Sequence, residues 1–287
     1  MSQITPFFDQ STFSYSYVVA DDSGHAAVID AVLDFDPAAV RATTGGADAI
    51  IKHIETAGLQ LDWILETHVH ADHLSAAQYI KARLGGQVAI GEHVTAVQEI
   101  FKGVFNAEAC FAADGSQFDR LLKEGDSLQL GNLTIDVMHT PGHTPACVTY
   151  LVNGAAFVGD TLFMPDYGSA RTDFPGGDAR ELYRSIRRIL ALPANTALYV
   201  CHDYGTDTRK TFACETDVAT QNENNIHMHA AVSETDFVAF REGRDAELAA
   251  PRLLYPSVQF NMRAGHFPPA ENNGRVYLKL PVRDVAS

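Results

Sequence analysis

The chain has 287 residues, of which 46% are hydrophobic and 20% are charged, so it holds enough apolar material for one large domain or two smaller ones. Its formal net charge is −15, which argues against a nucleic acid or an anionic membrane as partner, because both require a basic surface. Residues 1–6 lack the features of a secretory signal, and no apolar run approaches the roughly 20 residues of a membrane span. The four scattered cysteines predict reduced thiols, and we therefore expect a cytoplasmic protein.

The first half of the chain alternates strand-like and helix-like patterns. Residues 15–19 and 26–30 are typical of two strands, and the Asp/Ser/Gly cluster between them predicts a hairpin. Apolar residues at helical spacing then predict a helix over 48–57 that ends at Gly58. The elements that follow are a strand over 61–66, a helix over 75–84, a strand over 87–90 and a helical pattern over 94–101. This succession indicates an α/β layered fold.

From residue 126 onward the pattern becomes mostly β. Strands are predicted over 128–130, 133–138, 147–152 and 155–158, then a helix over 179–192, a strand over 197–201 and a last strand over 276–280. A capping box formed by Asp178 and Glu181 is predicted to start the helix. The pattern weakens after residue 225. We therefore divide the chain into a catalytic domain over 1–225 and a C-terminal extension over 226–287 that completes or packs on the same domain.

The segment between the strand over 61–66 and the helix over 75–84 contains four side chains of metal-binding type within six residues. Side chains two positions apart on an extended segment point the same way, so the first two histidines can face one point. The acid and the last histidine, at the turn into the helix, can face that point from the other side. Imidazole and carboxylate together suit zinc, iron or manganese rather than calcium. The four residues are His68, His70, Asp72 and His73.

Three further polar residues each follow a predicted strand. His143 lies in a Thr-Pro-Gly-His-Thr-Pro segment, Asp160 lies in Gly-Asp-Thr, and His202 follows the strand over 197–201. Side chains that hang from the same ends of several strands converge on one pocket. The joint pattern therefore predicts one metal site with seven candidate ligands, although each of these three residues alone would suggest a structural role.

Read together, these residues resemble the metallo-β-lactamase superfamily, whose fold is a four-layer αββα sandwich with the metal site at one edge of its sheets. The segments 159–163 and 168–178, and the tail segment 255–265, resemble more closely the persulfide dioxygenases, in particular their bacterial branch. That resemblance implies one Fe(II) per chain held by His70, His143 and Asp160, although His68 could take the place of His70. It also implies that glutathione persulfide and O2 are the substrates, with sulfite and glutathione as products, and it leaves a homodimer open.

In this interpretation the remaining members of the set, His68, Asp72, His73 and His202, orient the ligands and bound water. Because the chain keeps every residue of a two-metal site, a centre with two zinc ions stays open. The resemblance also makes Arg171 a candidate for holding glutathione, with pairing to Asp166 or Asp173 as the alternative. Tyr204 is a candidate for the pocket wall or for a buried tyrosine.

Three other functions compete with the dioxygenase. A glutathione thiolester hydrolase of the glyoxalase II type would use a two-metal centre to produce hydroxide at neutral pH. A nuclease of the same superfamily is disfavoured by the charge of −15. A non-catalytic metal-binding protein would tolerate a closed coordination sphere, whereas the expected site leaves positions open.

Overall fold

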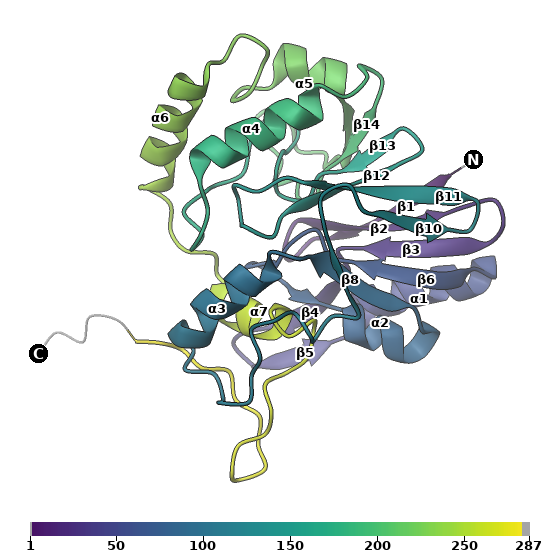
Figure 1. The fold of residues 1–287 in the computed structure, drawn as a ribbon, viewed down its shortest axis with the longest axis vertical. Coiled ribbons are helices and arrows are strands. Elements are labelled where there is room, and N and C mark those ends of the chain that lie inside the picture. Colours follow the sequence, from purple (N-terminus) through teal and green to yellow (C-terminus); the bar gives the residue numbers. More distant parts are fainter. Residues whose placement is uncertain (1, 283–287) are drawn as a thin grey trace, which may run out of the picture.

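The structure, a computed structural model, describes residues 2–282 as two facing β-sheets covered on both outer sides by helices (Figure 1). This is the expected α/β four-layer αββα sandwich. The first sheet has the strand order β1-β2-β3-β6-β8-β9, and the second has the order β10-β11-β12-β13-β14-β15. The strands of the first sheet are β1 (Gln3–Asp9), β2 (Ser14–Ala20), β3 (His25–Ile29), β6 (Gln60–Leu65), β8 (Gln87–Gly91) and β9 (Arg120–Leu122).

The second sheet is antiparallel except where β13 pairs in parallel with β14. Its strands are β10 (Ser127–Leu130), β11 (Leu133–His139), β12 (Val148–Val152), β13 (Ala155–Phe157), β14 (Ala197–Tyr199) and β15 (Glu215–Asp217). A small third sheet beside the first has the order β5-β4-β7. It consists of β4 (Val32–Asp36), β5 (Arg41–Thr43) and β7 (Leu74–Ser75).

The helices form the two outer layers (Figure 1). The layer on the first sheet contains α1 (Gly45–Ala57), α2 (Ala77–Leu84), α3 (Val94–Val104) and α7 (Leu254–Asn261). The layer on the second sheet contains α4 (Ala179–Leu190), α5 (Val218–Asn224) and α6 (Glu234–Asp245). No helix formed by residues 2–282 is long and apolar enough to cross a bilayer.

Three apolar clusters explain why these layers pack. One lies between the first sheet and its helices, one between the two sheets, and one between the second sheet and its helices. The stripe of Ile50, Ile51 and Ile54 on α1 is buried, and Gly58 ends that helix in the left-handed conformation at φ +66°, as the sequence predicted. Burial of such side chains contributes about 1.5–3 kcal/mol each, which is the main driving force for assembling the layers.

Two sequence predictions, the last strand and the capping box, need correction. No strand forms over 276–280, because the backbone of Lys279 pairs instead with the side-chain amide of Gln259, through both its N–H and its C=O. The capping box is half right. Asp178 accepts from the N–H groups of Arg180 and Glu181, but its own N–H donates to the carbonyl of Gly142. The four cysteines are free thiols, as expected.

The C-terminal extension has no separate core among residues 226–282. Met228 and Phe237 belong to the cluster beneath α4, whereas Val258, Phe260 and Met262 belong to the cluster beneath α1 and α2. The segment between α6 and α7 therefore runs from one helical layer to the other (Figure 1). We propose that residues 226–287 form an extension of one domain; residue 1 and residues 283–287 lie outside the described part.

Candidate metal centre

The loop that carries the first four candidate ligands leaves the end of β6 and is fixed by buried hydrogen bonds. The backbone N–H and the hydroxyl of Thr67 donate to the two oxygens of Asp30, at 2.7 and 2.8 Å. The side-chain amide of Asn261 donates to the carbonyls of His70 and His73, both at 2.8 Å. Elements far apart in sequence thus hold this loop against the sheet edge, which positions its side chains.

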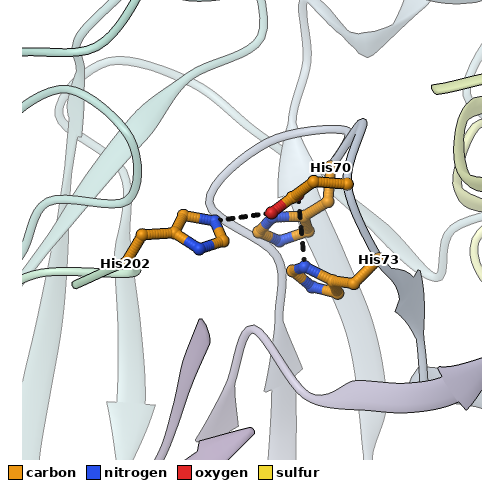
Figure 2. A group of neighbouring side chains, drawn as sticks. His70, His73 and His202 are labelled. Carbon is orange, nitrogen blue, oxygen red and sulfur yellow. Dashed lines mark ion pairs between the residues drawn. The ribbon is translucent and has the colours of Figure 1, made fainter. Parts of the chain in front are cut away.

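All seven predicted ligands lie at one edge of the sandwich. The Nε2 atoms of His68 and His143 each lie 3.7 Å from Asp160 Oδ2, and His202 Nε2 lies 3.4 Å from Asp160 Oδ1. Asp72 lies between His73, at 3.3 Å, and His202, at 3.2 Å. Figure 2 shows the rings of His70, His73 and His202 turned toward a common space.

The seven side chains fall into two groups, and within each group the possible ligand atoms lie within 4.8 Å of one another. The two groups meet where His202 lies beside Asp160. The first contains His68, His143 and Asp160, and the second contains His70, Asp72, His73 and His202. In this arrangement His68, rather than His70, is grouped with His143 and Asp160. The assignment of His70 as an iron ligand stays a prediction, and the arrangement has room for one cation or for two.

The chemistry of these side chains fits a metal. Six buried ligand atoms here lack a hydrogen-bond partner among the described residues, and each would cost about 1–3 kcal/mol if left unsatisfied. One or two cations bound among these atoms would supply the missing partners. The six atoms are His68 Nε2, His70 Nδ1, Asp72 Oδ2, His73 Nε2, Asp160 Oδ1 and His202 Nε2.

The other ring nitrogens have partners that fix the orientation of the histidines. His143 Nδ1 donates to the carbonyl of Arg171 at 2.8 Å, which leaves Nε2 free to bind a metal. His70 Nε2 lies 3.0 Å from Asp30 and 3.3 Å from Glu66, both buried. Burial and the neighbouring histidines lower the pKa of His68 well below its usual value, so the ring is in the neutral form that binds metals.

Asp30 and Glu66 are buried partners of the cluster that the sequence did not predict. Burial raises the pKa of Asp30, but His70 and the hydrogen bonds from Thr67 outweigh this effect and hold the pKa below its ordinary value. The position of Asp30 in the sequence could have indicated its place beside the cluster. Asp30 directly follows β3, and β3 pairs in parallel with β6, so these two strands end at the same edge of the sheet. Among residues that follow a strand in this way, only His143, Asp160 and His202 are predicted from the sequence to join the first four ligands.

A cavity of about 580 Å³ opens beside this cluster, and Asp72, His143 and Asp160 form part of its wall. Tyr204 also lines the cavity and stacks on His202, with ring centroids 5.5 Å apart and an angle of 7° between the planes. Burial, and then the charges of Asp72 and Asp160, raise the pKa of Tyr204, so its phenol stays protonated. A small substrate in this cavity would lie against the metal-binding side chains.

Arg171 lines the same cavity, but its guanidinium group is already engaged. Nε and Nη2 each donate to a carboxylate oxygen of Asp173 at 2.5 Å, and Nη1 donates to the carbonyl of Ala249 at 2.8 Å. The structure therefore has the pairing with Asp173 that the sequence left open as the alternative. The hydrogen bond to Ala249 connects the loop beside His143 to the C-terminal extension.

The hydrogen bonds of Asn261 lead to a testable prediction. Replacement of Asn261 by Ala removes two bonds to the loop and a third from the N–H of Ser75. Loss of such orienting partners typically weakens metal binding by about 10- to 100-fold, and we expect that loss here in competition with a chelator. Gln259→Ala is the matched control, because Gln259 lies on the same helix but contacts Tyr255 and Lys279. Equal metal affinity in the two folded variants would contradict the prediction.

The comparisons with known proteins agree with this fold and site. Residues 11–202 match the model of the metallo-beta-lactamase superfamily, and the chain belongs to that superfamily. It is 56% identical to a probable metallo-hydrolase of Burkholderia pseudomallei, over 96% of this chain and 97% of that protein. It is 44% identical to glyoxylase B2 of Dictyostelium discoideum, over 95% of this chain and 94% of that protein.

More distant relatives include persulfide dioxygenases. It is 30% identical to the mitochondrial persulfide dioxygenase ETHE1 of Mus musculus, over 90% of this chain and 87% of that protein. The crystal structure of ETHE1 from Myxococcus xanthus superposes with a TM-score of 0.73 at 27% identity, over 92% of this chain and the whole of the other. The chain is thus a metallo-β-lactamase-fold protein with a structural match to ETHE1 and closer relatives named as hydrolases.

Proposed function

We propose that this chain is an Fe(II)-dependent persulfide dioxygenase that converts glutathione persulfide and O2 to sulfite and glutathione. In the balanced reaction the outer sulfur loses four electrons to one O2, water supplies the third oxygen, and glutathione, bisulfite and one proton are released. The observation that carries the proposal is the exposure of His143 and Asp160 to the 580 Å³ cavity, on a fold that matches ETHE1.

The residues that would hold iron are His143, Asp160 and one of His68 and His70. Two imidazoles and one carboxylate form the facial set typical of non-haem iron oxygenases, in which positions stay open for substrates. When bound, ferrous iron would supply those open positions and would let O2 react with the sulfur, whereas the four electrons of the net reaction come from the persulfide. The protein's own contribution is orientation: Arg171 O fixes His143, and Asp30 fixes His70.

The cavity wall supports a substrate that carries sulfur. Phe163, Tyr167 and Tyr204 contact one another beside His202, with ring centroids 5.2–6.2 Å apart. The protonated phenol of Tyr204, which lines the cavity, can donate a hydrogen bond to an anionic sulfur or oxygen. Persulfides are more acidic than thiols, so such a donor suits the anionic form of the substrate.

The second candidate is a two-zinc hydrolase of glutathione thiolesters. It is favoured by Asp72, His73 and His202, each of which has a buried ligand atom without a hydrogen-bond partner, and by the similarity to glyoxylase B2. Both functions use glutathione-bearing substrates, so the shape of the cavity alone does not separate them.

Metal exchange separates the two functions. The metal-free protein is divided and loaded anaerobically with either Fe(II) or Zn(II), and each sample is assayed for sulfite from glutathione persulfide and for hydrolysis of S-lactoylglutathione. We expect sulfite only from the iron sample and no thiolester hydrolysis above the metal-free control in either sample. Hydrolysis by the zinc sample without sulfite from the iron sample would establish the second candidate instead.

A further inference from the structure

One wall of the cavity is rich in arginine, although the chain as a whole carries a net charge of −15. Three of these arginines, Arg241, Arg244 and Arg252, come from the C-terminal extension, on α6 and in the segment that leads to α7. Arg171 faces the same space. Positive charge is thus concentrated beside the cluster.

Most of the charged groups on this wall are paired, but two are not. Arg171 pairs with Asp173, and Arg241 pairs with Asp245 at 2.6 Å. Asp166, an acid of the wall outside the histidine cluster, pairs with Arg209 at 2.7 Å. Arg244 and Arg252 are exposed, and the guanidinium group of neither forms an ion pair or a hydrogen bond with a residue in the described part of the chain.

The positive charge of Arg244 acts on the cavity itself. Burial, followed by Arg241 and Arg244, lowers the pKa of His227 to about 4, so this wall residue stays neutral at physiological pH. Its Nδ1 accepts from the N–H of Ser169 at 3.0 Å, which places the ring hydrogen on Nε2. Besides the metal-binding side chains, the cavity therefore offers two unpaired guanidinium groups and a neutral imidazole.

We propose that Arg244 and Arg252 bind carboxylate groups of the substrate's thiol carrier while its sulfur lies at His143 and Asp160. Guanidinium groups match the geometry of carboxylates and form charge-assisted hydrogen bonds with them. The site therefore selects carriers with carboxylates remote from the sulfur, such as a small acidic peptide thiol, over neutral thiols. The sulfur end of this proposal rests on the proposed function, but the anion-binding end does not.

The test is a change in substrate selectivity in the double variant Arg244→Gln/Arg252→Gln. The ratio of kcat/KM for glutathione persulfide over that for the persulfide of neutral 2-mercaptoethanol is expected to fall about tenfold or more. Raising the ionic strength should lower that ratio in the unsubstituted protein and leave it nearly constant in the variant, because salt screens exposed charges. Arg180→Gln is the matched control, since Arg180 is an exposed arginine on α4 that pairs with Glu234 outside the cavity wall.

A binding measurement separates failure of this proposal from failure of the proposed function. Calorimetry with S-methylglutathione and the zinc-loaded protein requires no oxygen chemistry, and we expect about tenfold weaker binding in the double variant. Arginine-dependent binding by a protein that does not oxidise persulfide would refute the dioxygenase and keep the anion site. Persulfide oxidation with unchanged selectivity and unchanged binding in the double variant would refute the anion site alone.

Discussion

Replacement of Asp160 by Ala is expected to abolish turnover and to remove most of the bound metal. Asp160 is the carboxylate on which both groups of ligands meet, with oxygens 3.4–3.7 Å from His68, His143 and His202. Its loss leaves buried imidazoles without the negative charge that balances a cation. Since orienting partners alone are worth about 10- to 100-fold in activity or metal affinity, a direct ligand should cost at least about 100-fold.

The measurement pairs metal content with turnover on the same purified sample. Asp136→Ala is a suitable control, because Asp136 is an exposed carboxylate on β11 of the second sheet. Its side chain accepts a hydrogen bond from the hydroxyl of Ser127 and lies outside the cluster. Circular dichroism of both variants establishes that the fold is intact. An Asp160→Ala protein that keeps its metal and its activity would show that the metal centre has been misplaced.

The second large effect is expected from His70→Ala, which should also lose iron and turnover. The ring presents an unpartnered Nδ1 to the cluster, while Nε2 contacts Asp30 and Glu66. Removing the ring takes away one ligand and also the Nε2–H group that lies beside the buried carboxylates of Asp30 and Glu66. Loss of a buried hydrogen bond to a charged group typically costs about 1.5–3 kcal/mol, so thermal stability should fall as well.

Two further variants, His202→Ala and His68→Ala, show how many metal ions bind and which histidine of the first motif is a ligand. In a centre with one iron held by His143, Asp160 and a histidine of the first motif, His202→Ala should retain the metal, because His202 is not one of those three ligands. His68→Ala decides between the two first-motif histidines, since His68 is the one that lies nearest to Asp160 and His143. Iron retained in His70→Ala but lost in His68→Ala would transfer the ligand role to His68. Loss of half the metal in His202→Ala would indicate two ions.

The sequence was sufficient to predict the histidine cluster and the layered fold because both depend on local patterns. Strand β6 is a short apolar run, and the polar residues that follow it come immediately after its end. His143, Asp160 and His202 follow β11, β13 and β14 in the same way. These three strands run in one direction, because β12 lies antiparallel between β11 and β13 and β13 pairs in parallel with β14, so they end at the same edge. Proximity of the seven residues therefore follows from the order of strands in the two sheets.

The partners of the cluster could not be predicted because they depend on contacts between distant segments. Asn261 lies 186 residues from Ser75, to which it is hydrogen bonded, and nothing in its local sequence indicates this contact. Helices α6 and α7 are not predicted from the sequence because few of their residues form a buried apolar stripe. Their buried side chains pack on clusters formed by distant segments of the chain. The strand predicted over 276–280 had the right composition, but no neighbouring strand pairs with it among the described residues.

Arg171 shows the limit of transferring a residue's role by resemblance. Arg171 lies on the cavity wall, but its donors are engaged by Asp173 and by the carbonyl of Ala249. The unpaired arginines, Arg244 and Arg252, come from the segment with the weakest sequence pattern. Their position beside the cluster depends on how the chain runs from α6 to α7 between the two helical layers (Figure 1).

The most direct test of the central claim is oxygen uptake by protein loaded anaerobically with Fe(II), started by addition of glutathione persulfide and followed by assay of sulfite. We predict rapid uptake with one sulfite formed for each O2 consumed, and no uptake by the zinc-loaded protein. The account would be contradicted if the iron-loaded protein consumed no oxygen while the zinc-loaded protein hydrolysed a glutathione thiolester. The seven side chains would then form a two-metal hydrolytic centre.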